Sequence, residues 1–191
     1  MTALHERLRF DTADGQVLDD TRRYVLLRAD VLMGVFDELP EAAKGEALRA
    51  FGRSVARHGA DSVRAYAAAI GLDGLPAAME ESAASLGWGR WHIETAGSGD
   101  VTAPALRLAV ENSPFAAAAS PSTRPVCHAI AGMLEAVAGA LWQRPADARE
   151  THCAAQGGAT CSFVAVPRAA ASLPEPGPAR RPSRPPPGDT P

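Results

Sequence analysis

The chain has 191 residues, a formal net charge of −3 at pH 7 and 46% hydrophobic residues. That length suits one domain with its own core, or a domain followed by a tail. The weakly acidic balance gives no electrostatic support for binding nucleic acid or an anionic membrane surface. The sequence has no run of about 18 apolar residues that would predict a transmembrane helix, and its acidic start lacks the apolar core of a signal peptide. We therefore expect a cytoplasmic protein.

The first half of the chain is predicted to be mostly helical. The stretch 8–20 alternates apolar and polar residues around an Asp-Gly turn, which predicts a short hairpin. Apolar residues at helical spacing then predict three helices, which span 28–40, 41–71 and 73–87. Two glycines, Gly52 and Gly59, weaken the second of these predictions, because glycine in a helix interior costs about 1 kcal/mol.

The second half changes to an alternating pattern that predicts strands. The segments 88–95 and 104–114 alternate apolar with polar residues, and we expect the turn 96–103 to join them. A helix with Ser122 or Thr123 as its N-cap and Pro125 in its first turn follows. A second hairpin is expected around Gly157 and Gly158. The order of elements predicts an α+β fold, with an antiparallel sheet packed against helices.

The C-terminal segment differs in composition from the rest of the chain. Residues 170–191 carry half of the 16 prolines and almost no large apolar side chains. Such a segment buries too little surface to offset its ordering entropy, so we predict a disordered tail there. Residues 1–169 are predicted to form a single domain.

The chain has only three cysteines, Cys127, Cys153 and Cys161. In a reducing compartment an odd number of cysteines at uneven spacing favours metal binding or inert burial over disulfides. Cys153 and Cys161 flank a glycine-containing loop and can face each other, and Cys127 is placed in the first turn of a predicted helix. A tetrahedral zinc site needs a fourth ligand, and the candidates are Glu150, His152 and His128.

Three segments carry a resemblance to a known family. They are "NSPFA" at 112–116, "PVCHAIAGMLEAV" at 125–137 and "ETHCAAQGGATCSF" at 150–163. Together they resemble the signature of the 4-vinyl reductase domain family. The resemblance covers about 15–167, and its most specific part lies within 106–167.

The resemblance implies a fold, a metal site and a class of function. Similar domains form the sensory part of phenol- and xylene-responsive bacterial regulators, and their fold is related to subunits of vesicle-tethering complexes. In the phenol-sensing members three cysteines and a glutamate hold a structural zinc. That pattern matches Cys127, Glu150, Cys153 and Cys161 here, so the resemblance ranks Glu150 ahead of the two histidines.

The expected function follows from what the sequence has and what it lacks. We expect a small hydrophobic or aromatic ligand to bind near Trp88, Trp91, Ile93 and Phe115, because tryptophan offers flat apolar area for an aromatic ring. Dinucleotide, phosphate-loop, serine-hydrolase and iron–sulfur motifs are missing from the sequence, so we predict no redox activity for the chain alone. A bacteriochlorophyll or tetrapyrrole pathway factor and a ligand-free structural dimerisation domain stay open as alternatives, as does a homodimer of the binding module.

Overall fold

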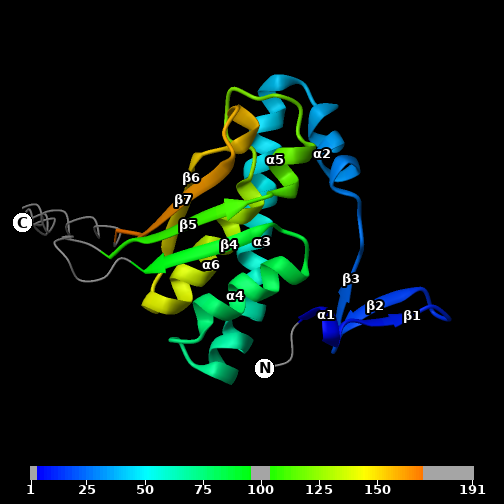
Figure 1. Ribbon diagram of the computed structural model, residues 1–191, viewed down its shortest axis with the longest axis vertical. Helices are drawn as coiled ribbons and strands as arrows, with labels where there is room; N and C mark the ends of the chain where they lie inside the picture. The colour runs from blue at the N-terminus through cyan, green and yellow to red at the C-terminus, as the bar shows by residue number, and fades with distance from the viewer. Residues whose placement is uncertain (1–3, 96–103, 170–191) are drawn as a thin grey trace, which may run out of the picture.

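The computed structural model describes residues 4–95 and 104–169. The turn predicted over 96–103 and the tail predicted over 170–191 lie outside the described residues. The elements form a helical and antiparallel β structure (Figure 1). The predicted α+β class is therefore confirmed.

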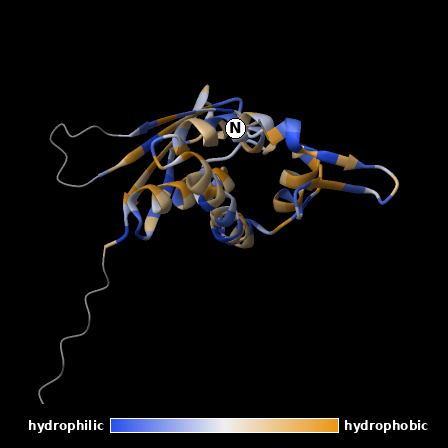
Figure 2. Ribbon diagram, turned by 90° about the horizontal axis from the view of Figure 1, so that it is seen from below, coloured by the Kyte–Doolittle hydropathy of each residue, from blue (hydrophilic) through white to orange (hydrophobic). Residues whose placement is uncertain are grey.

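The chain begins with a small three-stranded sheet. After the short helix α1 (Leu4–Arg7), the strands are β1 (Arg9–Asp11), β2 (Gln16–Asp19) and β3 (Arg22–Tyr24), paired antiparallel in the order β1-β2-β3. The predicted hairpin is confirmed, and β3 is a strand that the alternation over 8–20 did not include. This sheet projects from one side of the molecule (Figure 2).

Three helices follow where the periodicity predicts them. They are α2 (Ala29–Asp37), α3 (Glu41–Ile70) and α4 (Leu75–Ser85). Pro40 is the N-cap of α3, because proline fits the start of a helix and cannot continue one. The segment 25–28 is an extended connection from β3 to α2 (Figure 1).

A four-stranded antiparallel sheet forms one layer of the main body. Its strands are β4 (Arg90–Thr95), β5 (Leu106–Glu111), β6 (Ala146–His152) and β7 (Thr160–Pro167), in the order β4-β5-β7-β6. Alternate residues of β4, β5 and β7 are buried on one face, as the period of two requires. The buried set is Trp91, Ile93, Leu106, Leu108, Val110, Cys161, Phe163 and Ala165. Helices α4 and α6 pack on this sheet, and α3 packs on α6.

The predicted start of the second-half helix is wrong by several residues. The helix α6 spans His128–Trp142 and has Cys127 as its N-cap. Ser122 instead forms a local turn, in which its hydroxyl accepts a hydrogen bond from the N–H of Arg124 and donates one to the carbonyl of the same residue. A further short helix, α5 (Pro114–Ala118), precedes this turn, and a 3₁₀ turn, η1 (Ala154–Gln156), lies between β6 and β7.

Helices α3 and α6 cross in very close contact at two glycines. A Cβ placed on Gly132 would lie 2.0 Å from the carbonyl oxygen of Gly52, and one on Gly52 would lie 2.5 Å from the carbonyl oxygen of His128. Gly52, which weakened the helix prediction, is therefore required by packing. The contact holds α3 against the first half of α6, next to Cys127.

Candidate functional site

Four side chains predicted to bind a metal meet in the core. The ligand atoms of Cys127, Glu150, Cys153 and Cys161 all lie within 4.8 Å of one another. The Sγ atom of Cys127 is 3.8 Å from that of Cys153 and 3.7 Å from that of Cys161. All three cysteines are 0% exposed. Residues 34 positions apart in the sequence thus form one compact donor cluster.

An irregularity in β6 brings Glu150 and Cys153 to the same side of the sheet. Glu150 pairs with Phe163, whose side chain is buried, so Glu150 points to the face that also carries Cys161. The register then shifts between Glu150 and His152, which adds one residue to β6. In an ideal strand Cys153 would face the opposite way. The added residue returns it to the cluster.

The carboxylate of Glu150 is only partly satisfied. Its Oε2 accepts a hydrogen bond of 2.9 Å from the backbone N–H of Cys127. Its Oε1 is buried and has no hydrogen-bond partner among the residues that the structure describes. Burial, followed by the nearby Cys153, raises the pKa of Glu150 to about 8. A buried carboxylate oxygen without a partner carries a large desolvation cost, and a cation bound to the sulfurs would remove that cost.

The three thiols cannot all ionise without a cation. Contacts with Cys153 and Cys161 raise the pKa of Cys127, and the contact with Cys127 lowers the pKa of Cys153. The N–H of Ala154 donates to the Sγ of Cys161 at 3.2 Å, which supports negative charge on that sulfur. Three thiolates and one carboxylate oxygen are donors that Zn²⁺ accepts in a tetrahedron. The residues present therefore fit the ion.

The two histidines considered as fourth ligands lie outside the cluster. His152 is exposed on β6 and packs over Gly158, where an added Cβ would lie 2.2 Å from its Nε2. His128 is half-buried at the start of α6, and burial lowers its pKa. It lines a cavity of about 450 Å³ that also reaches Arg49 and Glu150. This cavity gives an ion a route to the carboxylate side of the cluster.

Ser113 is a site residue that the sequence analysis missed. Its hydroxyl lies 3.3 Å from the Sγ of Cys127 and also accepts a hydrogen bond from the N–H of Ala116, which caps α5. The Ser-Pro pair at 113–114 is the signal that could have identified it, because serine before proline is typical of a helix start.

The residues predicted to bind a ligand lie in a packed aromatic cluster. Trp91, Ile93 and Phe115 are buried, and Trp88 is half-buried. The rings of Trp88 and Phe115 meet edge to face with centroids 5.2 Å apart, and the indole N–H of Trp91 donates to the carbonyl oxygen of Trp88 at 3.1 Å. The cavities described here are lined by other residues.

A model of the 4-vinyl reductase domain family matches residues 106–167. This match confirms the resemblance to that family over the matched range. No curated protein matches the chain. Among the described residues, no helix has the length and apolar character needed to cross a membrane.

Three solved structures resemble the fold. A crystal structure of the phenol-responsive sensory domain of the transcription activator PoxR with phenol has 20% identity and a TM-score of 0.70, and the match covers 86% of each chain. A trafficking protein particle complex subunit 3 from Naegleria fowleri, covalently bound to palmitic acid, has 8% identity and a TM-score of 0.50 over 73% of this chain and 95% of that one. A vinyl-4-reductase family protein from Methanocaldococcus jannaschii has 14% identity and a TM-score of 0.47 over 72% of this chain and 88% of that one.

Proposed function

Because residues 106–167 match the 4-vinyl reductase domain, we propose that the chain is a small-molecule-binding sensory module held together by a structural zinc ion. The observation that carries the metal part is the buried cluster of Cys127, Glu150, Cys153 and Cys161, with one carboxylate oxygen left without a partner among the described residues. Three thiols and a carboxylate at this distance are a costly arrangement for a core unless a cation binds there.

The zinc would act as a structural cross-link. Bound by four protein side chains, it would have no open position for water or substrate, which is the pattern of structural sites. Its ligands come from the start of α6, the end of β6 and β7. The ion would therefore tie the helix to the last hairpin. Ser113 and the N–H of Ala154 would support the sulfurs from outside the coordination sphere.

The ligand part of the proposal places a small hydrophobic or aromatic molecule next to the cluster of Trp88, Trp91, Ile93 and Phe115. Edge-to-face contacts show that these rings already pack against aromatic partners. Trp88 is the least buried member, so a ligand would enter by displacing it. The similarity in fold to a sensory domain crystallised with phenol supports an aromatic ligand.

The proposal is tested by native mass spectrometry followed by ligand titration. We expect one zinc ion per chain in protein purified without chelators. Phenols and alkylbenzenes should then quench tryptophan emission saturably, and Trp88→Ala should abolish the effect, while Trp142→Phe, at the end of α6, should keep it. If zinc-loaded protein binds none of these ligands, the sensory proposal is wrong. A vinyl tetrapyrrole in the same panel tests the pathway alternative, with NADPH consumption as the sign of catalysis.

A second proposal, self-association, rests on an exposed apolar strip. The strip consists of Val25, Leu26, Leu27, Val31 and Val35, and Val25 and Leu26 are 80% and 69% exposed. It follows β3, which is an edge strand of the three-stranded sheet. An exposed apolar patch beside a free edge is typical of a protein interface. We propose a homodimer through this strip. Sedimentation should show a dimer that Leu26→Asp converts to a monomer, and a monomeric wild-type protein would exclude it.

A further inference from the structure

A long groove runs between α3 and α6 and ends at the turn before β6. It has a volume of about 850 Å³ and is here called the α3–α6 groove. Small apolar residues of the two helices form much of its lining, and they are half-buried. They include Ala56, Ala60, Ala67, Ala136, Gly139 and Ala140. Short side chains on facing helices leave this space unfilled.

Five arginines also line the α3–α6 groove. They are Arg53, Arg57, Arg64, Arg144 and Arg168. The three on α3 follow helical spacing, so they lie on one side of that helix. Arg144 comes from the turn after α6, and Arg168 comes from the end of β7. The concentration of positive charge stands out in a chain whose net charge is −3.

Three of these arginines have carboxylate partners. Arg53 pairs with Glu46, Arg64 with Asp61, and Arg168 with Asp147 and Glu135. Within the described residues, the guanidinium groups of Arg57 and Arg144 make no ion pair or hydrogen bond. Two uncompensated cations from separate elements therefore border one apolar cavity.

The backbone fixes the place of Arg144. Gln143 adopts a left-handed conformation with φ of 52°, and the N–H of Arg144 donates to the carbonyl oxygen of Gly139 at 3.2 Å. This is the usual way to close the C-terminus of a helix. The turn holds Arg144 beside Gly139 and Ala140, which line the same groove.

We propose that the α3–α6 groove binds a small amphipathic organic anion, with its apolar body on the alanine-rich lining and its carboxylate or sulfonate on Arg57 and Arg144. The groove volume lies within the range of about 300–1,000 Å³ that is common for small-molecule sites. Guanidinium groups bind carboxylates through paired, charge-assisted hydrogen bonds. This site is separate from the aromatic cluster and does not depend on the proposed function.

Charge disfavours the occupants that the chain itself could supply. A second copy across a two-fold axis would place the same arginines opposite one another. The C-terminal segment 170–191 contains Arg180, Arg181 and Arg184 against only Glu175 and Asp189, so it would also be repelled. A neutral apolar ligand would bury the two guanidiniums without a partner. An organic anion satisfies both the charge and the lining.

The test compares two fluorescent probes with closely similar apolar bodies. The anionic probe is 1-anilinonaphthalene-8-sulfonate, and the neutral probe is N-phenyl-1-naphthylamine. In folded full-length protein, Arg57→Ala/Arg144→Ala should weaken binding of the anionic probe by about tenfold or more, because two charge-assisted contacts are lost. Binding of the neutral probe should change less than about twofold. Thermal melting of each variant checks that it stays folded, as expected for two exposed side chains.

Two further variants give the test a control and a change of opposite sign. Arg22→Ala/Arg107→Ala removes two exposed arginines elsewhere and should leave both probes unaffected. Glu135→Gln removes the carboxylate in the groove and should tighten the anionic probe by about twofold. Loss of both probes to the same degree in the Arg57/Arg144 variant, or an equal loss in the control variant, would overturn the proposal. Wild-type protein that binds neither probe would also overturn it and would favour an acidic protein segment as the partner.

Discussion

The region around the cysteines and the region before α3 use apolar and unusual side chains in opposite ways. In the first, which comprises α6, β6 and β7, the cysteines are fully buried and the helix crosses its neighbour on glycine. In the second, which comprises β1–β3, the segment 25–28 and α2, large aliphatic side chains face solvent. A region that buries its most demanding residues is stable by its own packing. One that exposes apolar residues needs a partner to cover them.

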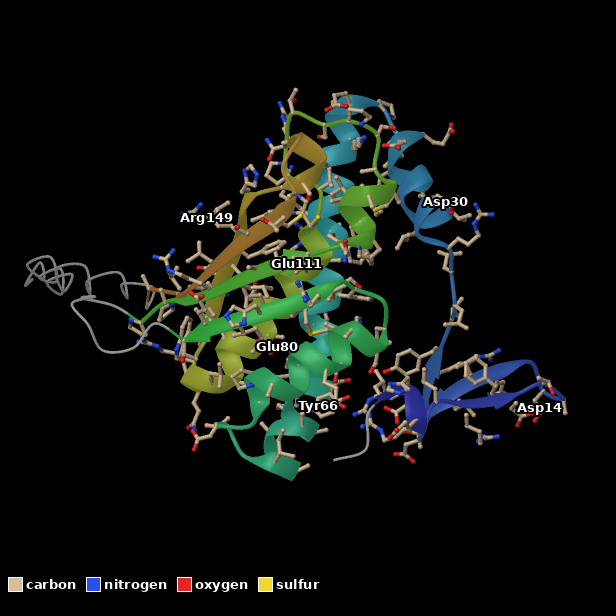
Figure 3. All side chains as sticks on the ribbon, in the orientation of Figure 1. Asp14, Asp30, Tyr66, Glu80, Glu111 and Arg149 are labelled. Carbon is tan, nitrogen blue, oxygen red and sulfur yellow. The ribbon has the colours of Figure 1, made fainter. Side chains whose placement is uncertain are left out.

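The two regions also differ in how they are attached to the body. The N-terminal sheet is held by polar contacts: Arg7 donates hydrogen bonds to Asp19 and to the hydroxyl of Tyr66 on α3. Figure 3 shows Tyr66 beside this sheet and Asp14 at its far tip. The cysteine region instead packs on α3 through backbone contact at Gly52 and Gly132. Losses in the cysteine region should therefore affect global stability, whereas losses in the N-terminal region should affect it less.

The largest effect is expected from removing a zinc ligand. Cys153→Ala or Cys161→Ala should abolish zinc binding and lower the free energy of unfolding by roughly 4 kcal/mol or more, since loss of a structural metal is among the most damaging changes. Elemental analysis and thermal melting with and without a chelator measure both effects. His152→Ala, an exposed neighbour, is the matched control and should keep the metal. Wild-type protein that contains no zinc and melts unchanged with chelator would show that the cysteines are inert.

A smaller effect is expected where α3 and α6 cross. Gly132→Ala should lower the free energy of unfolding by about 2–4 kcal/mol, because its Cβ would collide with the backbone of Gly52. Gly45→Ala is the matched control on α3, where the nearest atom, on Arg49, lies 3.6 Å from the added Cβ. It should stabilise the protein by about 0.5–1 kcal/mol. Urea unfolding measures both, and a Gly132 variant as stable as wild type would show that the helices can separate at little cost.

The periodicity of apolar residues predicted the fold class well, because burial of one face is a local property of the sequence. It placed Trp91, Ile93, Leu106 and Leu108 on one face, and the structure confirms this placement. The start of α6 was wrong because the N–H of Cys127 is bound by Glu150, a contact between residues far apart in the chain. Local capping rules cannot anticipate such a contact.

The candidate metal site was predicted only in part by physical reasoning from the residues. Spacing alone left Glu150, His152 and His128 open as ligands. The register shift in β6, which brings Glu150 and Cys153 together, has no clear signal in the residues 150–153. The α3–α6 groove was missed because alanine and glycine are ordinary residues of packed helices, and arginines at helical spacing are typical of a solvated surface.

The smallest effect is expected where α2 is tied to the body. The carboxylate of Asp37 accepts hydrogen bonds from Lys44 at 2.5 Å and from the hydroxyl of Ser120 at 2.8 Å. The hydrogen bond from Lys44, the largest cause, lowers the pKa of Asp37 below its usual 3.8. The side chains of Lys44 and Asp37 are 15% and 27% exposed, so the solvent screens much of the interaction. We expect Asp37→Asn to cost about 0.5–1 kcal/mol at pH 7.

The pH dependence of this difference distinguishes charge from packing. A carboxyl group with a lowered pKa contributes its stability above its unfolded pKa and loses it as the pH falls through its folded pKa. The gap between wild type and Asp37→Asn should therefore be constant above about pH 5 and close below the usual pKa of 3.8. Urea unfolding of both proteins from pH 3 to pH 7 measures it. A gap that persists at pH 3 would mean that the amide disturbs packing at Ser120. A gap that is absent at pH 7 would mean that α2 contributes nothing to the stability of the body, so that its exposed valines are free to serve an interface.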